Sequence, residues 1–284
     1  MNAAEEHWDL IIKPKTSLFS IDFKQVWRYR DLMLLFVKRD FVATYKQTIL
    51  GPLWFIVQPL LTTITFMVIF GNIAKISTEG VPHILFYLSG IVMWGYYSEC
   101  LTKTSDTFSV NSDLFGKVYF PRLIVPFSII ISSMIRLSIQ LVLFFCFWTY
   151  YYFYKGIPLQ VNSTVFLFPL LLILMAGHGL ALGIIISSMT TKYRDLRFLV
   201  QFGVQLLMYA SPVVYPLSSV PEKYKWILLL NPMTSIIETF KYGFLGIGVF
   251  NYQYLIYNFL SLVVILFVGF VVFNKVEKSF MDTV

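Results

Sequence analysis

The sequence predicts an all-α membrane protein with six transmembrane helices. Hydrophobic residues make up 57% of the 284 residues and charged residues only 13%, and the mean hydropathy is +0.72. Soluble globular domains carry about 25% charged residues. The composition therefore excludes a soluble domain, and several apolar stretches reach the length of about 20 residues that a helix needs to cross a bilayer.

Residues 1–48 are predicted to form a cytoplasmic segment that ends in an amphipathic helix. The first 30 residues carry charges and no uninterrupted apolar core, so they do not resemble a cleavable signal peptide. From residue 23 to residue 46, apolar side chains gather on one arc of a helical wheel and cationic side chains on the neighbouring arc. Such a helix lies at the inner surface of a bilayer, either as a simple anchor or as a ledge for a cytoplasmic partner.

Residues 49–284 are predicted to form the six-span transmembrane domain. The predicted spans are 50–72, 84–101, 123–153, 164–189, 198–215 and 254–273. Sixteen Lys and Arg residues fall on the side of the N-terminus and five on the opposite side, which predicts that both termini are cytoplasmic. The basic surplus is thus an orientation signal rather than a footprint of nucleic acid.

The cytoplasmic connector 111–121, NSDLFGKVYFP, is predicted to contain a short helix. Asn111, Ser112 and Asp113 are suited to cap its start, and Pro121 ends it at about Phe120. A plain connector has no need for so many apolar side chains, which usually mark a contact surface. The segment is therefore predicted to be a docking knob, with a loop that dips into lipid as the alternative.

The outer connector 211–251 is too long for a bare loop in a compact protein. It contains two apolar pieces broken by prolines, and neither is long enough for a convincing span. We expect two short helices that enter and leave the membrane by the same face, because broken backbone at membrane depth lines a wet cavity or is buried in protein. This arrangement predicts a gate, and two helices lying flat on the outer surface are the alternative.

Three features inside the spans stand out. Gly179, Gly183 and Ser187 lie four residues apart, which is the small-residue spacing that brings two helices close together. Arg136 is a strong charge deep in the third span, where it is expected either to pair with Glu99 or to line a polar path. No phosphate-binding loop, metal motif or catalytic pair is present in the sequence, so the chain is predicted to be a non-enzyme that takes its energy from another subunit.

Four motifs in order resemble the six-span permeases of polysaccharide ABC exporters, which move O-antigen, capsule or teichoic-acid chains. The motifs are YKQTILGPLWFIVQPLL (45–61), KVYFPRLIVP (117–126), YRDLR (193–197) with SPVVYP (211–216), and NPMTSIIETFKYGFLG (231–246). The resemblance covers nearly the whole chain. It implies the ABC-2 exporter fold, with an interface helix, a coupling helix at about 111–121 and re-entrant gate helices between spans five and six.

The resemblance also implies partners and roles. The chain would form a homodimer in the bacterial inner membrane with two cytoplasmic ATPase subunits, which bind ATP and Mg, and it would need no cofactor of its own. Lipid-pyrophosphate-linked polysaccharide would pass to the periplasm through a channel between the protomers. The implied ATPase-coupling residues are Asp113, Leu114, Phe115, Lys117, Tyr119 and Phe120, and the cytoplasmic loop contributes Tyr193, Arg194 and Asp195. The implied gate residues are Pro212, Pro216, Pro232, Glu238 and Lys241.

Two further groups of residues are hypotheses built on this scheme. The cations of the interface helix that could attract the lipid diphosphate are Arg28, Lys38, Arg39 and Lys46. The aromatic residues that could line the channel are Trp54, Phe55 and Tyr209. An ABC-2 permease for a drug or small lipid is the alternative within transport, and a membrane-embedded glycan-modifying enzyme is the alternative from another class.

Overall fold

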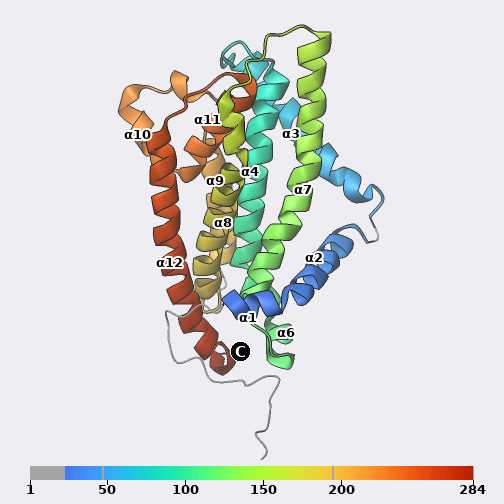
Figure 1. Cartoon of the computed structure of the whole chain (residues 1–284), viewed down its shortest axis with the longest axis vertical. Helices are drawn as coiled ribbons and strands as arrows, with labels where there is room; N and C mark the ends of the chain where they lie inside the picture. The colour runs from blue at the N-terminus through green and yellow to red at the C-terminus, as the bar shows by residue number, and fades with distance from the viewer. Residues whose placement is uncertain (1–22, 47, 194, 284) are drawn as a thin grey trace, which may run out of the picture.

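The structure is a computed structural model that describes residues 23–46, 48–193 and 195–283. The described residues form helices and turns, with no strand among them. The long helices stand side by side along the vertical axis of Figure 1, with α6 at one end of the bundle and α10 and α11 at the other. The predicted all-α class is therefore confirmed, and residues 1–22 of the predicted N-terminal segment lie outside the described residues.

The elements follow the chain in a simple order. The α-helices are α1 (Phe23–Arg28), α2 (Arg30–Tyr45), α3 (Trp54–Phe66), α4 (His83–Ser105), α5 (Thr107–Val110), α6 (Ser112–Lys117), α7 (Ile124–Thr149), α8 (Phe168–Thr190), α9 (Leu196–Tyr209), α10 (Glu222–Leu230), α11 (Pro232–Leu245) and α12 (Tyr252–Thr283). Five shorter helical pieces extend or connect them, namely η1 (Gly51–Leu53), η2 (Met67–Ile73), η3 (Tyr150–Tyr154), η4 (Ser163–Leu167) and η5 (Leu217–Ser219).

Four helical runs among the described residues are long and apolar enough to cross a membrane. They are Gly51–Ile73, Ile124–Tyr154, Ser163–Thr190 and Tyr252–Glu277, and they match the first, third, fourth and sixth predicted spans. The fifth predicted span is represented by α9, which is apolar but has only 14 residues, because the chain turns at Ser211–Pro212. The second is represented by α4, which has 23 residues but is less apolar than the four. Six spans therefore remain a prediction.

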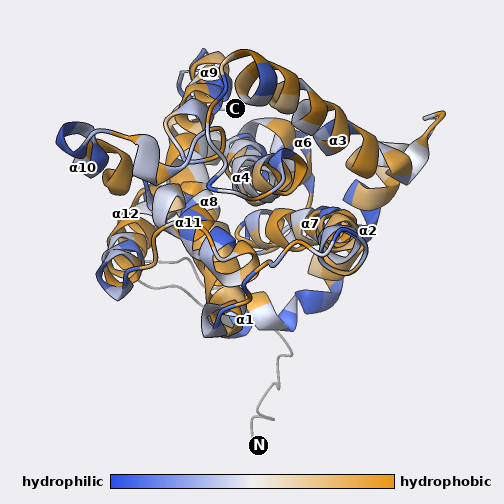
Figure 2. Cartoon of the chain, turned by 90° about the horizontal axis from the view of Figure 1, so that it is seen from above, coloured by the Kyte–Doolittle hydropathy of each residue, from blue (hydrophilic) through white to orange (hydrophobic). Residues whose placement is uncertain are grey.

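The position of α4 explains its composition. Fifteen of its 23 residues are buried, and it packs against α3, α7, α8, α9 and α11. Figure 2, seen along the bundle, places α4 inside the outer helices. A helix surrounded by protein can carry serine, glycine and charged residues, whereas a helix that faces lipid needs an apolar surface. The same central position makes α4 the contact surface for most of the bundle.

The small residues of α8 allow α8 to lie close against α4. A Cβ atom added to Gly179 would lie 2.6 Å from the Cβ atom of Cys100, and one added to Gly183 would lie 2.5 Å from that of Thr104. One turn further on, the hydroxyl of Ser187 accepts a hydrogen bond from the backbone N–H of Phe108 at 3.2 Å. The predicted packing role of the Gly179, Gly183 and Ser187 stripe is confirmed.

The junction between α2 and α3 is a short connector with a turn at Gly51 and Pro52. The sequence predicted one amphipathic helix from residue 23 to residue 46. The helix is instead divided at Tyr29 into α1 and α2, and it ends at Tyr45. Gly51 adopts φ +51°, which a glycine accommodates without strain, and Pro52 opens the following turn. Beyond this turn α3 leans obliquely across the bundle in Figures 1 and 2 instead of standing parallel to α7.

Replacing Gly183 by valine is expected to lower the melting temperature of the purified protein. The added side chain would overlap Thr104, and overpacking of this kind costs about 1–3 kcal/mol. Gly203→Ala in α9 is the matched control, because a Cβ atom there meets nothing within 4 Å. Thermal unfolding of both variants in detergent, followed by size-exclusion chromatography, tests the expectation, and equal melting temperatures would contradict it.

Candidate functional site

The predicted coupling segment contains α6 and lies at the lower end of the bundle in Figure 1, which is called the α6 end below. Its helix, α6, begins where expected but ends at Lys117 instead of near Phe120, and Val118 is already extended. The physical reason lies in the residues that follow, because Pro121 disfavours a helical conformation at Phe120 and the Phe120 ring packs on Phe36 of α2 at 5.7 Å. The predicted helix was therefore about three residues too long.

The six predicted coupling residues divide between two faces. Asp113, Lys117 and Tyr119 are exposed, and Leu114 is half-buried. Phe115 and Phe120 are only 6% and 5% exposed, so they point into the chain's own core. If this segment contacts a partner, the exposed residues make the contact and the two phenylalanines hold the segment in place.

An aromatic cluster anchors the coupling segment to three helices far apart in the sequence. The cluster consists of Phe36, Phe108, Phe115, Phe120 and Phe273. Phe108 stacks on Phe273 of α12 with ring centres 4.8 Å apart, and Phe115 lies 6.0 Å from Phe108. A displacement of α6 would therefore be transmitted to α2 and α12 through packed rings.

Two backbone contacts strengthen the same junction. Arg122, which follows the coupling segment, donates a hydrogen bond to the backbone carbonyl of Glu277 in α12 at 2.7 Å. Thr190, the last residue of α8, donates one to the backbone carbonyl of Ser105 at 3.1 Å. The first contact links the end of the coupling segment to α12, and the second links α8 to α4 next to it.

The YRDLR loop between α8 and α9 is tied to the α4–α5 junction by an ion pair that the sequence did not reveal. Arg197 lies 2.8 Å from Asp106, the residue that joins α4 to α5. Tyr193 and Asp195, which were singled out from the sequence, are exposed, and Arg194 lies outside the described residues. The contact at Arg197 therefore joins the start of α9 to the end of α4.

The cationic face of the interface helix is largely open to solvent. Lys38, Arg39 and Lys46 are exposed. Arg39 forms a 2.8 Å ion pair with Asp40 and lies over the ring of Phe36 at 4.7 Å.

The buried face of this helix differs from the predicted stripe. The predicted stripe, the apolar arc of the helical wheel, contains Phe23, Trp27, Leu34, Val37, Phe41 and Tyr45. Val37 is buried where α2 packs on α7, but Trp27 and Leu34 are exposed, and the buried Phe36 lies outside the predicted stripe. The contact with α7 selects the buried face, and a helical wheel carries no information about that contact.

The three residues predicted to line a channel have different surroundings. Trp54 is 46% exposed and Tyr209 is 44% exposed. Phe55 is buried, with the guanidinium of Arg136 5.2 Å above its ring. Only one residue of α9, Val204, is buried, so most of α9 faces away from the described part of the chain.

The predicted gate region forms α10 and α11, and these two helices differ sharply in burial. α10 contains no buried residue, whereas eleven of the 14 residues of α11 are buried. α11 packs against α4, α8, α12 and η4, so it does not lie flat on the surface. Asn231 caps α11 by accepting a hydrogen bond from Met233 N–H at 3.0 Å, and Pro232 occupies its first turn.

A charged cluster holds α11 to the surrounding loops. Lys241 is fully buried, and its Nζ donates a hydrogen bond to the carbonyl of Pro212 at 2.6 Å. The same ammonium group lies 3.4 Å from the ring centre of Phe86 in α4. Glu238, one helical turn earlier, accepts a hydrogen bond from Val249 N–H at 2.9 Å, and its charge stabilises that of Lys241. Two of the predicted gate motifs therefore meet at Lys241 and Pro212.

A residue that sequence reasoning missed completes this cluster. Glu79 has φ +55°, which is uncommon for a residue other than glycine. Its carboxylate accepts hydrogen bonds from the Ser218 hydroxyl and, at 2.9 Å, from the Gly248 N–H. The Glu79 loop thereby joins both ends of the gate region. In the sequence, the one signal for this role was a charged residue next to Gly80 in the connector between two apolar segments.

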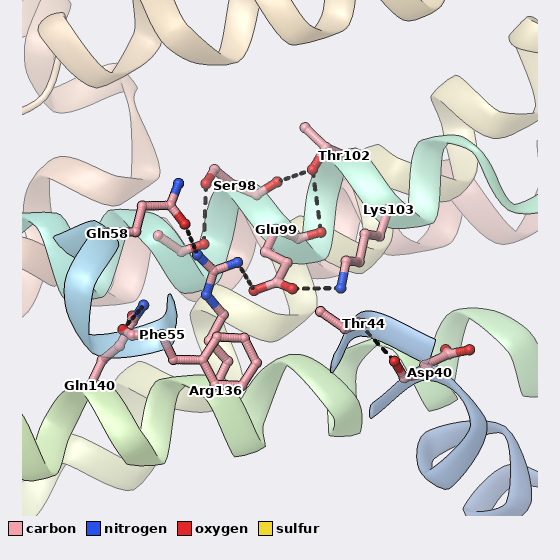
Figure 3. Close-up of polar contacts among 11 residues, drawn as sticks. Asp40, Thr44, Phe55, Gln58, Ser98, Glu99, Thr102, Lys103, Arg136 and Gln140 are labelled. Carbon is pink, nitrogen blue, oxygen red and sulfur yellow. Dashed lines mark hydrogen bonds and ion pairs between the residues drawn. The ribbon is translucent and has the colours of Figure 1, made fainter. Parts of the chain in front are cut away.

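Arg136 and its neighbours form a polar cleft inside the bundle (Figure 3). The guanidinium of Arg136 in α7 donates to Gln58 of α3 at 2.8 Å and to Glu99 of α4 at 3.4 Å. The other carboxylate oxygen of Glu99 lies 2.6 Å from Nζ of Lys103. Both sequence alternatives for Arg136 are thus realised, because it pairs with Glu99 and also lines a cleft of about 390 Å³.

Replacing Lys241 by methionine is expected to destabilise the protein by about 1–3 kcal/mol, because it leaves the buried carbonyl of Pro212 without its hydrogen-bond donor and removes the cation near the buried Glu238. The double variant Lys241→Met with Glu238→Gln should recover part of this loss, since both charges are then absent. Lys155→Met, at an exposed position, is the control. Melting temperatures in detergent decide the question, and an unchanged value for Lys241→Met would refute the role assigned to the pair.

Comparison with known proteins places these features in a family. The ABC-2 type transporter family matches residues 31–245 of the chain. The chain is 26% identical to the O-antigen export system permease protein RfbA of Klebsiella pneumoniae, over 89% of this chain and 94% of that protein. It is 24% identical to the polysialic acid transport protein KpsM of Escherichia coli, over 86% of this chain and 93% of that protein. It is also 27% identical to the inner membrane transport permease YadH of Escherichia coli K12, over 68% and 76% of the two chains.

Proposed function

The chain belongs to the ABC-2 type transporter family, and we propose that it is the membrane subunit of an ATP-driven exporter that moves lipid-linked polysaccharide from the cytoplasm to the periplasm. The observation that carries the proposal is the similarity, over nearly the full length of both chains, to a relative named as an O-antigen export permease. A second relative of similar coverage is named as a polysialic acid transport protein. Because its relatives are named as transport permeases, the chain is a transport subunit and not a glycan-modifying enzyme.

ATP hydrolysis is assigned to two cytoplasmic partner subunits, which would bind ATP and Mg. The α6 end of the bundle is the proposed seat of the ATPase, since Asp113, Lys117 and Tyr119 are exposed there on a segment rooted in the aromatic cluster. Apolar and aromatic groups exposed on a well-anchored segment are typical of a docking surface. The α6 end is accordingly proposed to be cytoplasmic, in the bacterial inner membrane, with both chain termini on that side.

The channel is proposed to lie between two copies of the chain, beside α3 and α9. These helices carry many exposed apolar side chains, and α9 has a single buried residue. Trp54 and Tyr209 are the aromatic residues proposed to meet the sugar chain, while α10 and α11 with Pro212, Pro216 and Pro232 would form a re-entrant gate at the exit. Buried Phe55 would support Arg136 from below instead of meeting the sugar directly.

An ABC-2 permease for a drug or a small lipid is the second candidate. It is favoured by the relative named only as an inner membrane transport permease, which is as similar in sequence but covers less of the chain. The two candidates differ in the cargo that accumulates when the transporter is absent.

Deletion of the gene for this chain is expected to abolish surface polysaccharide in the bacterium that carries it. Unexported polymer should accumulate inside the cell, because synthesis continues without an exit. Gel electrophoresis and immunoblotting of surface and cytoplasmic fractions provide the measurement, with a plasmid copy of the gene as the control. Normal surface polysaccharide in the deletion strain would sink the proposal and favour the second candidate.

Simultaneous replacement of Lys38, Arg39 and Lys46 by glutamine is expected to reduce export while assembly with the ATPase persists. Each cation near an anionic surface contributes about 1 kcal/mol to attraction, so three together matter for capture of a lipid diphosphate. Arg28 belongs to the same proposed set, and Arg28→Gln is tested as a separate single variant. Surface polysaccharide and co-purification of the ATPase are measured in parallel, and unchanged export by the triple variant would rule out this role.

A further inference from the structure

The polar cleft between α3, α4 and α7 has no role in the proposed ATPase seat or gate. Arg136 lies halfway along α7, which contains no other charged residue. A charge at such a depth is costly and normally serves a function when it faces a cavity. The side chains that line the cleft come from four helices and are Gln58, Pro59, Thr62, Ile91, Trp94, Gly95, Ser98, Glu99, Thr102, Lys103, Arg136, Gln140 and Met208.

Arg136 retains donor capacity toward the cleft. A guanidinium group has five N–H donors in a planar fork. Within the described residues, the side-chain acceptors that serve it are one oxygen of Gln58 and one of Glu99, the latter at a long 3.4 Å. The Arg136 side chain is 26% exposed, and its guanidinium borders the open volume. Several N–H groups are thus available for acceptors on a ligand.

The charges of the cleft favour a neutral polar ligand over a phosphate. Glu99 lies between Arg136 and Lys103, and each of its carboxylate oxygens faces one of the two cations. An incoming phosphate would meet this carboxylate and would have to displace it. A hydroxyl group, in contrast, donates to a carboxylate and accepts from a guanidinium without disturbing the pair.

The neutral polar side chains of the cleft match the same ligand class. The amide oxygen of Gln58 accepts from Arg136, which leaves the two N–H donors of Gln58 for a ligand. Gln140 donates one N–H to the carbonyl of Phe55 at 3.4 Å, which leaves its amide oxygen and its second N–H. Ser98 and Thr102 also line the cleft. Trp94 and Met208 close the apolar side. A volume of about 390 Å³ is at the small end of the range for ligand sites, about 300–1,000 Å³, so the cleft suits a small group and not a bundle of chains.

We propose that this cleft is a binding subsite for a sugar unit of the exported polysaccharide, with Arg136, Glu99, Gln58 and Gln140 recognising its hydroxyl groups. The inference rests on the proposed polysaccharide substrate. The cleft adjoins the start of α3, which carries Gln58 and follows the turn at Gly51. A sugar bound here would sit between the cationic interface helix and the proposed channel.

The first test compares two replacements of Arg136. Arg136→Gln leaves Glu99 with Lys103 at 2.6 Å, so the carboxylate keeps a partner and the chain should still assemble with its ATPase. Arg136→Lys keeps the charge but loses the planar fork. A sugar subsite predicts that both variants lower export by about tenfold or more, the scale for a lost hydrogen bond to a charged group. Export at the wild-type level by Arg136→Lys would show that Arg136 only neutralises Glu99 and would overturn the proposal. Lys155→Gln is the control for charge loss.

The second test measures occupancy of the cleft directly. Thr62→Cys is placed in a chain that also carries Cys100→Ser and Cys146→Ser, and Val161→Cys in the exposed connector between η3 and η4 is the control. Labelling by N-ethylmaleimide is compared in membranes from cells that make the polysaccharide and cells that do not, both with a hydrolysis-deficient ATPase partner. The subsite is supported if Thr62→Cys is labelled more slowly in membranes with polysaccharide than in membranes without it, while the control is labelled at the same rate in both. Equal labelling of Thr62→Cys in the two kinds of membrane overturns the proposal.

The two failures are distinguishable. If the deletion strain keeps its surface polysaccharide, the proposed function itself is wrong. If the deletion strain loses its polysaccharide while Arg136→Lys exports normally and Thr62→Cys is labelled equally, the function stands and the subsite does not.

Discussion

The close approach of α8 to α4 is the constraint on which the remaining structure depends. Lipid chains offer no hydrophobic preference for one apolar helix over another, so helices in a membrane associate through close packing and hydrogen bonds. Gly179 and Gly183 remove the side chains that would separate α8 from α4. With that contact in place, α4 is held at the centre, and α3, α7, α9 and α11 are arranged around it. The buried polar side chains of α4, such as Ser89 and Thr104, are then covered by protein and do not meet lipid.

The charged groups on and beside α4 are distributed along its whole length. Each of three regions contacts α4 through one cation, at a different level of the helix. These contacts join Lys241 to the Phe86 ring, Arg136 to Glu99, and Arg197 to Asp106 just beyond its end. The gate region, the polar cleft and the YRDLR loop are therefore all attached to α4 or to its end. A shift of α4 relative to its neighbours would be felt in all three regions, and an isolated change at one of them would be resisted by the other two.

Local patterns predicted much of this arrangement, and long-range contacts decided the rest. The stripe at Gly183 and the depth of Arg136 in its span are properties of neighbouring residues, so periodicity revealed both. The inward orientation of Phe120 was hidden, because an aromatic residue in a short connector looks exposed until the helix that covers it is known. The pairing of Arg197 with Asp106 joins residues about ninety positions apart in the sequence. The pattern of a single sequence describes neighbouring residues and does not show which distant segments lie side by side. The central position of α4 explains why its sequence is the least lipid-like of the long helices.

The attachment of α9 suggests how the two ends of the molecule communicate. At its start, Arg197 binds Asp106 beside the coupling segment, and just beyond its end the carbonyl of Pro212 binds the buried Lys241 of α11. Within α9 itself only Val204 is buried. A helix fixed at both ends and little covered along its length can tilt without breaking a packed core, because few side chains must repack. A tilt of α9, the helix proposed to line the channel, would then link the Asp106 contact with α11 while α4 stays in place as the support.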